Sequence, residues 1–178
     1  MNKRYSAVSF LPLCSAALAL TILLHPVSAI SNEKLPDPAS SVELVIKGDL
    51  EKTNADNEAR FDISMLQALP RTEFTTMTPW DEGLQHFAGV RVSDLLKYVG
   101  AKTQDFKAVG YDDYKFDVTD VDFEKFPVII AYEHNGHPIS LRKLGPLRII
   151  FPISDYPELA DQIYEASAVW QLVEMQLL

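Results

Sequence analysis

Short stretches of alternating apolar and polar residues, or of β-branched and aromatic residues, recur along the chain and are typical of β-strands. Residues 106–118 fit two strands that are joined by a turn at Asp112 and Asp113. Further strands are predicted at residues 42–48, 71–78, 146–152 and 169–178. The pattern therefore predicts a protein in which strands dominate.

Residues 127–140, with the sequence PVIIAYEHNGHPIS, are predicted to form a β-hairpin. Asn135 and Gly136 are a pair that a two-residue type I′ turn prefers, because this turn needs positive φ angles. His134 and His137 flank the turn. We interpret them as polar hairpin positions, since a zinc site needs three or four protein ligands and two histidines do not supply them.

Three short helices are predicted from their capping residues and apolar spacing. The first covers residues 61–69, with Asp62 as its N-cap. The second covers residues 90–101, where apolar residues recur at helical spacing before Gly100, a good C-cap. The third covers residues 157–168 and carries acidic residues in its first turn.

Two polar stretches, residues 49–60 and 79–89, are predicted to be loops. With short helices among many strands, the fold class is predicted to be α+β, as a mixed β-sheet domain with short helices.

The first 29 residues have the pattern of a signal peptide. Two basic residues are followed by an uncharged, largely apolar run over residues 6–24. Val27 and Ala29 occupy the small-residue positions of a signal-peptidase site. We expect cleavage after Ala29 and a periplasmic or otherwise exported protein without membrane insertion. The alternative is an uncleaved anchor, because the uncharged run could just span a bilayer.

Cleavage would leave 149 residues, enough for one domain with its own core. Residues 30–41 are polar and contain two prolines, so they are predicted to be a flexible leader. Residues 42–178 are predicted to form the single domain.

The chain is acidic, with a formal net charge of -9 and a pI near 4.8. The signal peptide, residues 1–29, holds two basic residues and no acid, so cleavage would change the charge to -11. Such a surface disfavours nucleic acids and anionic membranes, both of which attract Lys and Arg. The partners that we expect are a small-molecule ligand or an exported sensor or other partner protein.

Motifs of common catalytic sites are lacking in the sequence. Cys14 is the only cysteine and lies in the expected signal peptide, so the cleaved chain would hold no thiol. No glycine-rich nucleotide fingerprint and no G-x-S-x-G motif occurs. No catalytic residue and no metal ligand is therefore predicted.

The candidate binding residues are polar groups in otherwise apolar surroundings. The first group is a set of threonine hydroxyl groups beside a tryptophan in TEFTTMTPW, residues 72–80. The second is an aspartate next to a tyrosine, and the third is a pair of basic residues just before Gly145 and Pro146, with Arg148 soon after it. Each group has a structural alternative, since threonines favour strands, acids form turns, and an arginine can pair with an acid. The candidates are Thr75, Thr76, Thr78, Trp80, Asp113, Tyr114, Arg142 and Lys143.

Over residues 42–178 the order of motifs resembles the molybdopterin-binding domain family of oxidoreductases, which has the sulfite oxidase fold. The motifs are TTMTPW, FAGVRVSDLLKYVGA, VGYDDYKFDV, VIIAYEHNGHPIS, LGPLRIIFP and VWQL, in this order. The resemblance implies that TEFTTMTPW ends a strand at the rim of the cofactor groove. It also makes molybdopterin the candidate cofactor, although the residues alone leave the cofactor unknown.

Two departures from the family pattern bear on activity. Catalytic members hold molybdenum through a cysteine thiolate in the stretch where this chain has Thr75, Thr76, Met77 and Thr78. Family members also have a basic residue before the last tryptophan, where this chain has Val169. The resemblance is thus to a small exported branch that lacks the molybdenum-ligand cysteine. We expect a ligand- or partner-binding module without bound molybdenum. The alternatives are an active molybdenum-cofactor-dependent oxidoreductase and a structural module without a small ligand.

Overall fold

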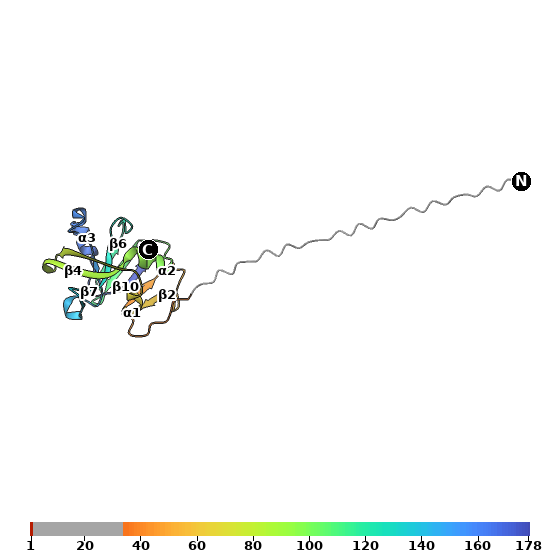
Figure 1. Ribbon diagram of the computed structural model, residues 1–178, viewed down its shortest axis with the longest axis horizontal. Coiled ribbons are helices and arrows are strands. Elements are labelled where there is room, and N and C mark those ends of the chain that lie inside the picture. The colour runs from red at the N-terminus through yellow and green to blue at the C-terminus, as the bar shows by residue number, and fades with distance from the viewer. Residues whose placement is uncertain (2–33) are drawn as a thin grey trace. The chain divides into compact units, whose positions relative to one another are not determined.

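Two β-sheets form the body of the protein in the computed structural model (Figure 1). The structure describes Met1 and residues 34–178. The expected signal peptide and the first residues of the expected leader therefore lie outside the described residues, apart from Met1. Contacts within the chain divide it into Met1–Ser31 and Asn32–Leu178, and the described fold is that of the second unit.

The first sheet has five strands and is mixed. Within the described residues, β1 and β10 pair in parallel, with Val45 opposite Glu174, and the other neighbours are antiparallel. The order in the sheet is β2 (Glu58–Phe61), β1 (Leu44–Lys47), β10 (Leu172–Leu177), β5 (Phe106–Gly110) and β6 (Lys115–Val118).

The second sheet is antiparallel and is built around a long hairpin. Its order is β3 (Arg71–Thr78), β4 (Asp81–Arg91), β7 (Ile129–His134) and β8 (His137–Pro138), and β9 (Arg148–Ile150) also pairs with β7. An isolated bridge between Arg148 and Trp170 joins β9 to the segment that leads into β10. This bridge connects the second sheet to the first.

The helices are short. Asp62 caps α1 (Ile63–Gln67) by accepting a hydrogen bond from the Met65 amide at 2.9 Å, and Gly100 ends α2 (Val92–Val99) with a φ of 66°. Both caps were predicted, and both are confirmed. The remaining helical segments are the 3₁₀ turns η1 (Leu141–Lys143) and η2 (Pro157–Leu159) and the helix α3 (Gln162–Ser167).

The core is one large apolar cluster with a smaller one beside it. The large cluster unites inner residues of both sheets with the apolar face of α2, which contributes Val92, Leu95, Leu96 and Val99. The smaller cluster lies within the second sheet and contains Phe87, Ile129, Ala131, Ile139 and Ile150. α3 packs near β6 at the end of the domain away from α1 and β2 (Figure 1).

The predicted fold class is confirmed, since mixed and antiparallel sheets with short helices form an α+β domain. The predicted hairpin turn is also confirmed, because Asn135 and Gly136 have φ angles of 49° and 77°. The strands predicted at residues 71–78 and 106–118 appear as β3 and as β5 with β6.

The prediction of a loop at residues 79–89 was wrong. These residues form most of β4, an eleven-residue strand that pairs with β3 on one side and with β7 on the other. Gly89 lies where β4 meets β7, and a Cβ atom there would be 2.1 Å from the Ile130 carbonyl oxygen. The end of the loop predicted at residues 49–60 is likewise a strand, β2.

The described part of the expected flexible leader is held against the domain. Leu35 is 3% exposed, and its amide donates to the Thr53 carbonyl oxygen at 3.1 Å. The amides of Ala39 and Ser40 donate to the Asp62 carboxylate at 2.7 and 2.9 Å. The ordered domain therefore begins before residue 42, and Asp62 joins this segment to α1. Within residues 34–178, the helices are too short and too polar to span a bilayer.

Candidate ligand-binding groove

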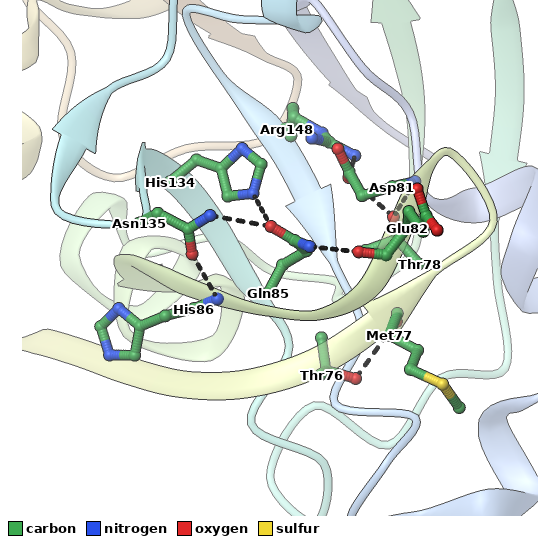
Figure 2. A network of polar contacts seen from close by, with 10 residues as sticks. All are labelled: Thr76, Met77, Thr78, Asp81, Glu82, Gln85, His86, His134, Asn135 and Arg148. Carbon is green, nitrogen blue, oxygen red and sulfur yellow. Dashed lines mark hydrogen bonds and ion pairs between the residues drawn. The ribbon is translucent and has the colours of Figure 1, made fainter.

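An ion pair fixes the tip of the β3–β4 hairpin to β9. Arg148 is 1% exposed, and its Nη2 atom donates to Asp81 Oδ2 at 3.0 Å. The hydroxyl group of Thr78 donates to the same carboxylate oxygen at 2.8 Å (Figure 2). The tip, which carries Trp80, is thus held by a contact between residues far apart in the sequence.

The Arg148 guanidinium group also lies against aromatic rings. Its central carbon is 5.9 Å from the centre of the Trp80 ring and 5.2 Å from that of Phe87. Phe87 in turn stacks on His134, with ring centres 4.6 Å apart. Cation–π contacts of this kind offset part of the cost of burying the Arg148 Nε and Nη1 atoms, which have no hydrogen-bond partner within the described chain.

A small polar network continues from His134 along β4 and β7. The Gln85 Oε1 atom accepts hydrogen bonds from His134 Nε2 at 2.9 Å and from Asn135 Nδ2 at 2.8 Å (Figure 2). The Asn135 Oδ1 atom accepts from the His86 amide at 3.0 Å. These bonds give the hairpin turn a fixed position on β4.

Burial and nearby charges set the ionisation states in this network. Burial lowers the pKa of His134, the charges of Arg148 and Lys143 lower it further, and only Asp81 opposes them. His134 is therefore neutral at pH 7. Burial raises the pKa of Asp81, but the hydrogen bond from Thr78 and the charge of Arg148 outweigh it, so that the pKa lies below its usual value. Asp81 is therefore ionised.

Two adjoining cavities flank Trp80. The first, here called the apolar pocket, has a volume of about 140 Å³ and is lined mainly by apolar side chains that include Met77, Pro79, Trp80, Phe151, Leu159 and Tyr164. The second, here called the aromatic groove, has a volume of about 460 Å³ and is lined by Trp80, Tyr114, Gln162, Glu165, Ala166, Ala168 and Trp170. Trp80, Glu165 and Ala168 border both cavities.

Four separate parts of the fold place the walls of the aromatic groove. Trp80 comes from the hairpin tip, and Glu165 comes from α3. Tyr114 follows the turn after β5, and its hydroxyl group donates to the Ala166 carbonyl oxygen at 3.3 Å, which ties this turn to α3. Trp170 is held by its bridge to Arg148. Both tryptophans of the chain therefore border one groove.

The predicted threonines have different surroundings. Thr76 is fully buried, and its hydroxyl group and that of Ser154 lie 3.3 Å apart. Thr75 is exposed on β3 opposite His86. Thr78 lines the apolar pocket, although its hydroxyl group is bonded to Asp81.

The other predicted residues are only partly brought together. Trp80 and Tyr114 line the same groove. Asp113 is an exposed turn residue with a φ of 64°. Arg142 and Lys143 are exposed in η1 and border neither cavity.

Sequence reasoning missed the residues that organise the site. It grouped Arg148 with the exposed residues Arg142 and Lys143, although Arg148 is buried. The available signal was its place in the apolar run PLRIIFP, where a lone arginine on a buried strand needs a buried partner. Nothing in the local sequence marked Glu165 or Trp170 as groove residues.

Comparisons with known proteins agree with this architecture. A family model described as the oxidoreductase molybdopterin binding domain matches residues 34–154. The crystal structure of the sulfane dehydrogenase SoxCD from Paracoccus pantotrophus is similar, with a TM-score of 0.55 and 19% sequence identity. The match covers 75% of this chain but only 37% of the SoxCD chain, so it shows the shared fold alone. A search of curated proteins finds no match. Because the family model covers more than half of the chain, this protein belongs to the oxidoreductase molybdopterin-binding domain family.

Proposed function

We propose that this domain is an exported binding module, which takes a ligand beside Trp80 and does not hold molybdenum through a protein thiolate. One observation carries the proposal. Trp80 borders both cavities, and the Arg148–Asp81 ion pair holds the hairpin tip that carries it.

The donor atoms at the hairpin tip do not fit a thiolate-bound molybdenum centre. The hydroxyl groups of Thr76 and Thr78 are bonded to Ser154 and Asp81. The one cysteine, Cys14, lies in the expected signal peptide. Within the described residues, no group of three or more His, Cys, Asp and Glu side chains is placed to hold a metal ion. A hydroxyl group is also a hard ligand, unlike the soft thiolate.

The aromatic groove is equally unsuited to the phosphate group of a pterin cofactor. Binding of a phosphate favours arginine or lysine side chains, and neither occurs among the described residues that line the groove. Glu165 would instead repel an anion. Arg142 and Lys143, the cationic pair that the sequence suggested, border neither cavity.

A second function, that of an active molybdenum-dependent oxidoreductase, is favoured by one observation, the family match over residues 34–154. Membership of a fold family is weak support for activity, because function depends on the residues of the site. A partner protein is a further occupant of the groove, for example an exported sensor that inserts a side chain beside Trp80.

Export rests on the sequence of residues 1–29. It is tested by sequencing the N-terminus of the protein recovered from the extracytoplasmic fraction. We expect the chain to start at Ile30. Recovery of the intact chain in the membrane fraction would instead support the uncleaved anchor.

The binding function is tested by a thermal-shift screen with chemically diverse small molecules. A ligand at about 100 times its dissociation constant should add about 2.7 kcal/mol of stability. Trp80→Ala should remove this shift. The matched control is Tyr111→Ala, which removes an exposed aromatic side chain near the groove that borders neither cavity. If no compound gives a shift, or if Trp80→Ala keeps it, the proposal is wrong.

A further inference from the structure

The chemistry of the two cavities identifies a class of ligand. We propose that the site takes a small organic cation, a quaternary or alkylated ammonium group that carries a short apolar chain. The ammonium group lies in the aromatic groove, and the chain enters the apolar pocket. This inference rests on the proposed binding function and specifies its ligand.

Aromatic side chains form much of the wall of the groove. Trp80 and Tyr114 are 38% and 42% exposed, and Trp170 completes the set. Exposed indole and phenol rings attract ammonium groups through their negative faces, and tryptophan does so best. Tyr114 is held in place by its hydrogen bond to the Ala166 carbonyl oxygen.

The charge at the groove has the matching sign. Among the described residues that line the groove, Glu165 is the one carboxylate, and none is a lysine, arginine or histidine. The Glu165 side chain makes no hydrogen bond or ion pair with another described residue, so it remains available to a cation. An anionic ligand would meet this carboxylate without any compensating positive charge.

Arg148 does not compete with the ligand for Trp80. Its side chain is 1% exposed and does not line the groove, whereas Trp80 is 38% exposed and does. Its charge is also compensated by Asp81. Arg148 therefore supports the indole ring, and part of Trp80 remains accessible to a ligand.

The apolar pocket explains why the cation should carry a chain. The pocket meets the groove at Trp80, Glu165 and Ala168. Beyond this junction its lining is mainly apolar, with Phe151 and Leu159 among the side chains. An alkyl chain attached to the ammonium group would extend from the junction into the apolar pocket and bury its methylene groups in it. Each fully buried methylene group contributes about 0.8 kcal/mol to the binding free energy.

Tryptophan fluorescence tests the inference, because both tryptophans of the chain border the groove. The purified protein is titrated with hexyltrimethylammonium chloride, tetramethylammonium chloride, 1-hexanol and sodium hexanoate at constant ionic strength. We expect saturable emission changes with the first compound and at least about tenfold weaker binding of tetramethylammonium, which lacks the chain. Hexanol and hexanoate should not saturate in the same range.

Substitutions then locate the bound cation. Glu165→Gln keeps the shape of the side chain and should weaken hexyltrimethylammonium binding about fivefold, as measured by calorimetry. Asp155→Asn is the matched control, since it removes the same charge from an exposed residue that borders neither cavity. Its affinity should equal that of the wild type.

Each contrary outcome has a distinct meaning. If hexanoate or hexanol binds as tightly as the cation, the ligand class is wrong although the binding function stands. If none of the four probes saturates, the cation inference is overturned, and the ligand screen alone decides the binding function. Equal losses of affinity in Glu165→Gln and Asp155→Asn would also overturn it, because the effect would then come from overall charge.

Discussion

Arg148 and Asp81 form an ion pair of 3.0 Å in which the arginine side chain is buried and the aspartate side chain is 18% exposed. The pair joins β9 to the tip of the β3–β4 hairpin. Because the same guanidinium group lies against Trp80, the position of that ring depends on a residue 67 positions away from Asp81. The candidate site is therefore a product of tertiary structure.

Removing the carboxylate should destabilise the protein. Asp81→Asn leaves the buried guanidinium group of Arg148 without its counter-charge, and we expect the free energy of unfolding to fall by about 2–4 kcal/mol in urea titrations. Glu82→Gln is the control on the same hairpin tip. It is exposed and should change stability by less than about 0.5 kcal/mol. Equal, small effects of both substitutions would show that the ion pair contributes little.

A double-mutant cycle should show that the two residues act together. Arg148→Met removes the buried charge, so adding Asp81→Asn to it no longer leaves an unpaired guanidinium group. We expect a coupling free energy of at least about 1 kcal/mol between the two substitutions. Additive effects would mean that Arg148 stabilises the protein through packing alone.

Acidification should destabilise the protein through His134. Its pKa in the folded state is lowered by burial and by the charges of Arg148 and Lys143, so the unfolded chain binds the proton more readily. The stability that neutral His134 provides is complete above about pH 6.5 and is lost as the pH falls through the folded pKa. An NMR titration should give a pKa below 6.5 for His134. His134→Gln should reduce the pH dependence of stability between about pH 5 and 7, and an unchanged dependence would contradict this account.

A second pH effect should come from Asp62, which joins residues 39 and 40 to α1. Hydrogen bonds from Ser64, from the Met65 amide and from residues 39 and 40 lower the pKa of Asp62 well below its usual range, although burial opposes them. The stability from this carboxylate is therefore present above about pH 4 and is lost as the pH falls through the folded pKa.

Asp62→Asn tests this connection by thermal unfolding and hydrogen exchange. We expect a lower melting temperature at pH 7, a difference from the wild type that shrinks below about pH 4, and faster exchange of the Ala39 and Ser40 amides. Asp37→Asn, an exposed change in the same segment, should leave all three unchanged. Unaltered exchange in Asp62→Asn would show that other contacts hold the segment.

The sequence correctly predicted the features of the fold that depend on local patterns of residues. The Asn135–Gly136 turn, the Asp62 and Gly100 caps and the strand β3 depend on residues close in the chain, and the structure has all of them. β4 was missed because Pro79, Asp81 and Gly83 are typical of loops. The strand is stabilised by pairing with β7, which lies far away in the sequence.

The candidate site was only partly predictable for the same reason. Trp80 and Tyr114 were identified because aromatic residues beside polar groups suggest a binding surface. The residues that meet them, Glu165 and Trp170, come from another part of the chain, and no local pattern links them. Arg142 and Lys143 were chosen for their charge. The charge of a residue in an exposed turn does not indicate whether its side chain borders a cavity.

The central claim is that this family member holds no thiolate-bound molybdenum. The most direct measurement is the molybdenum content per chain, together with the fluorescence of released pterin, for protein purified from cells that make the cofactor and export it. A catalytic family member that has the cysteine, purified in parallel, shows that the cofactor was available. We expect far less than one molybdenum atom per chain and no released pterin. One tightly held molybdenum atom per chain, with turnover of an oxidisable substrate, would contradict the account.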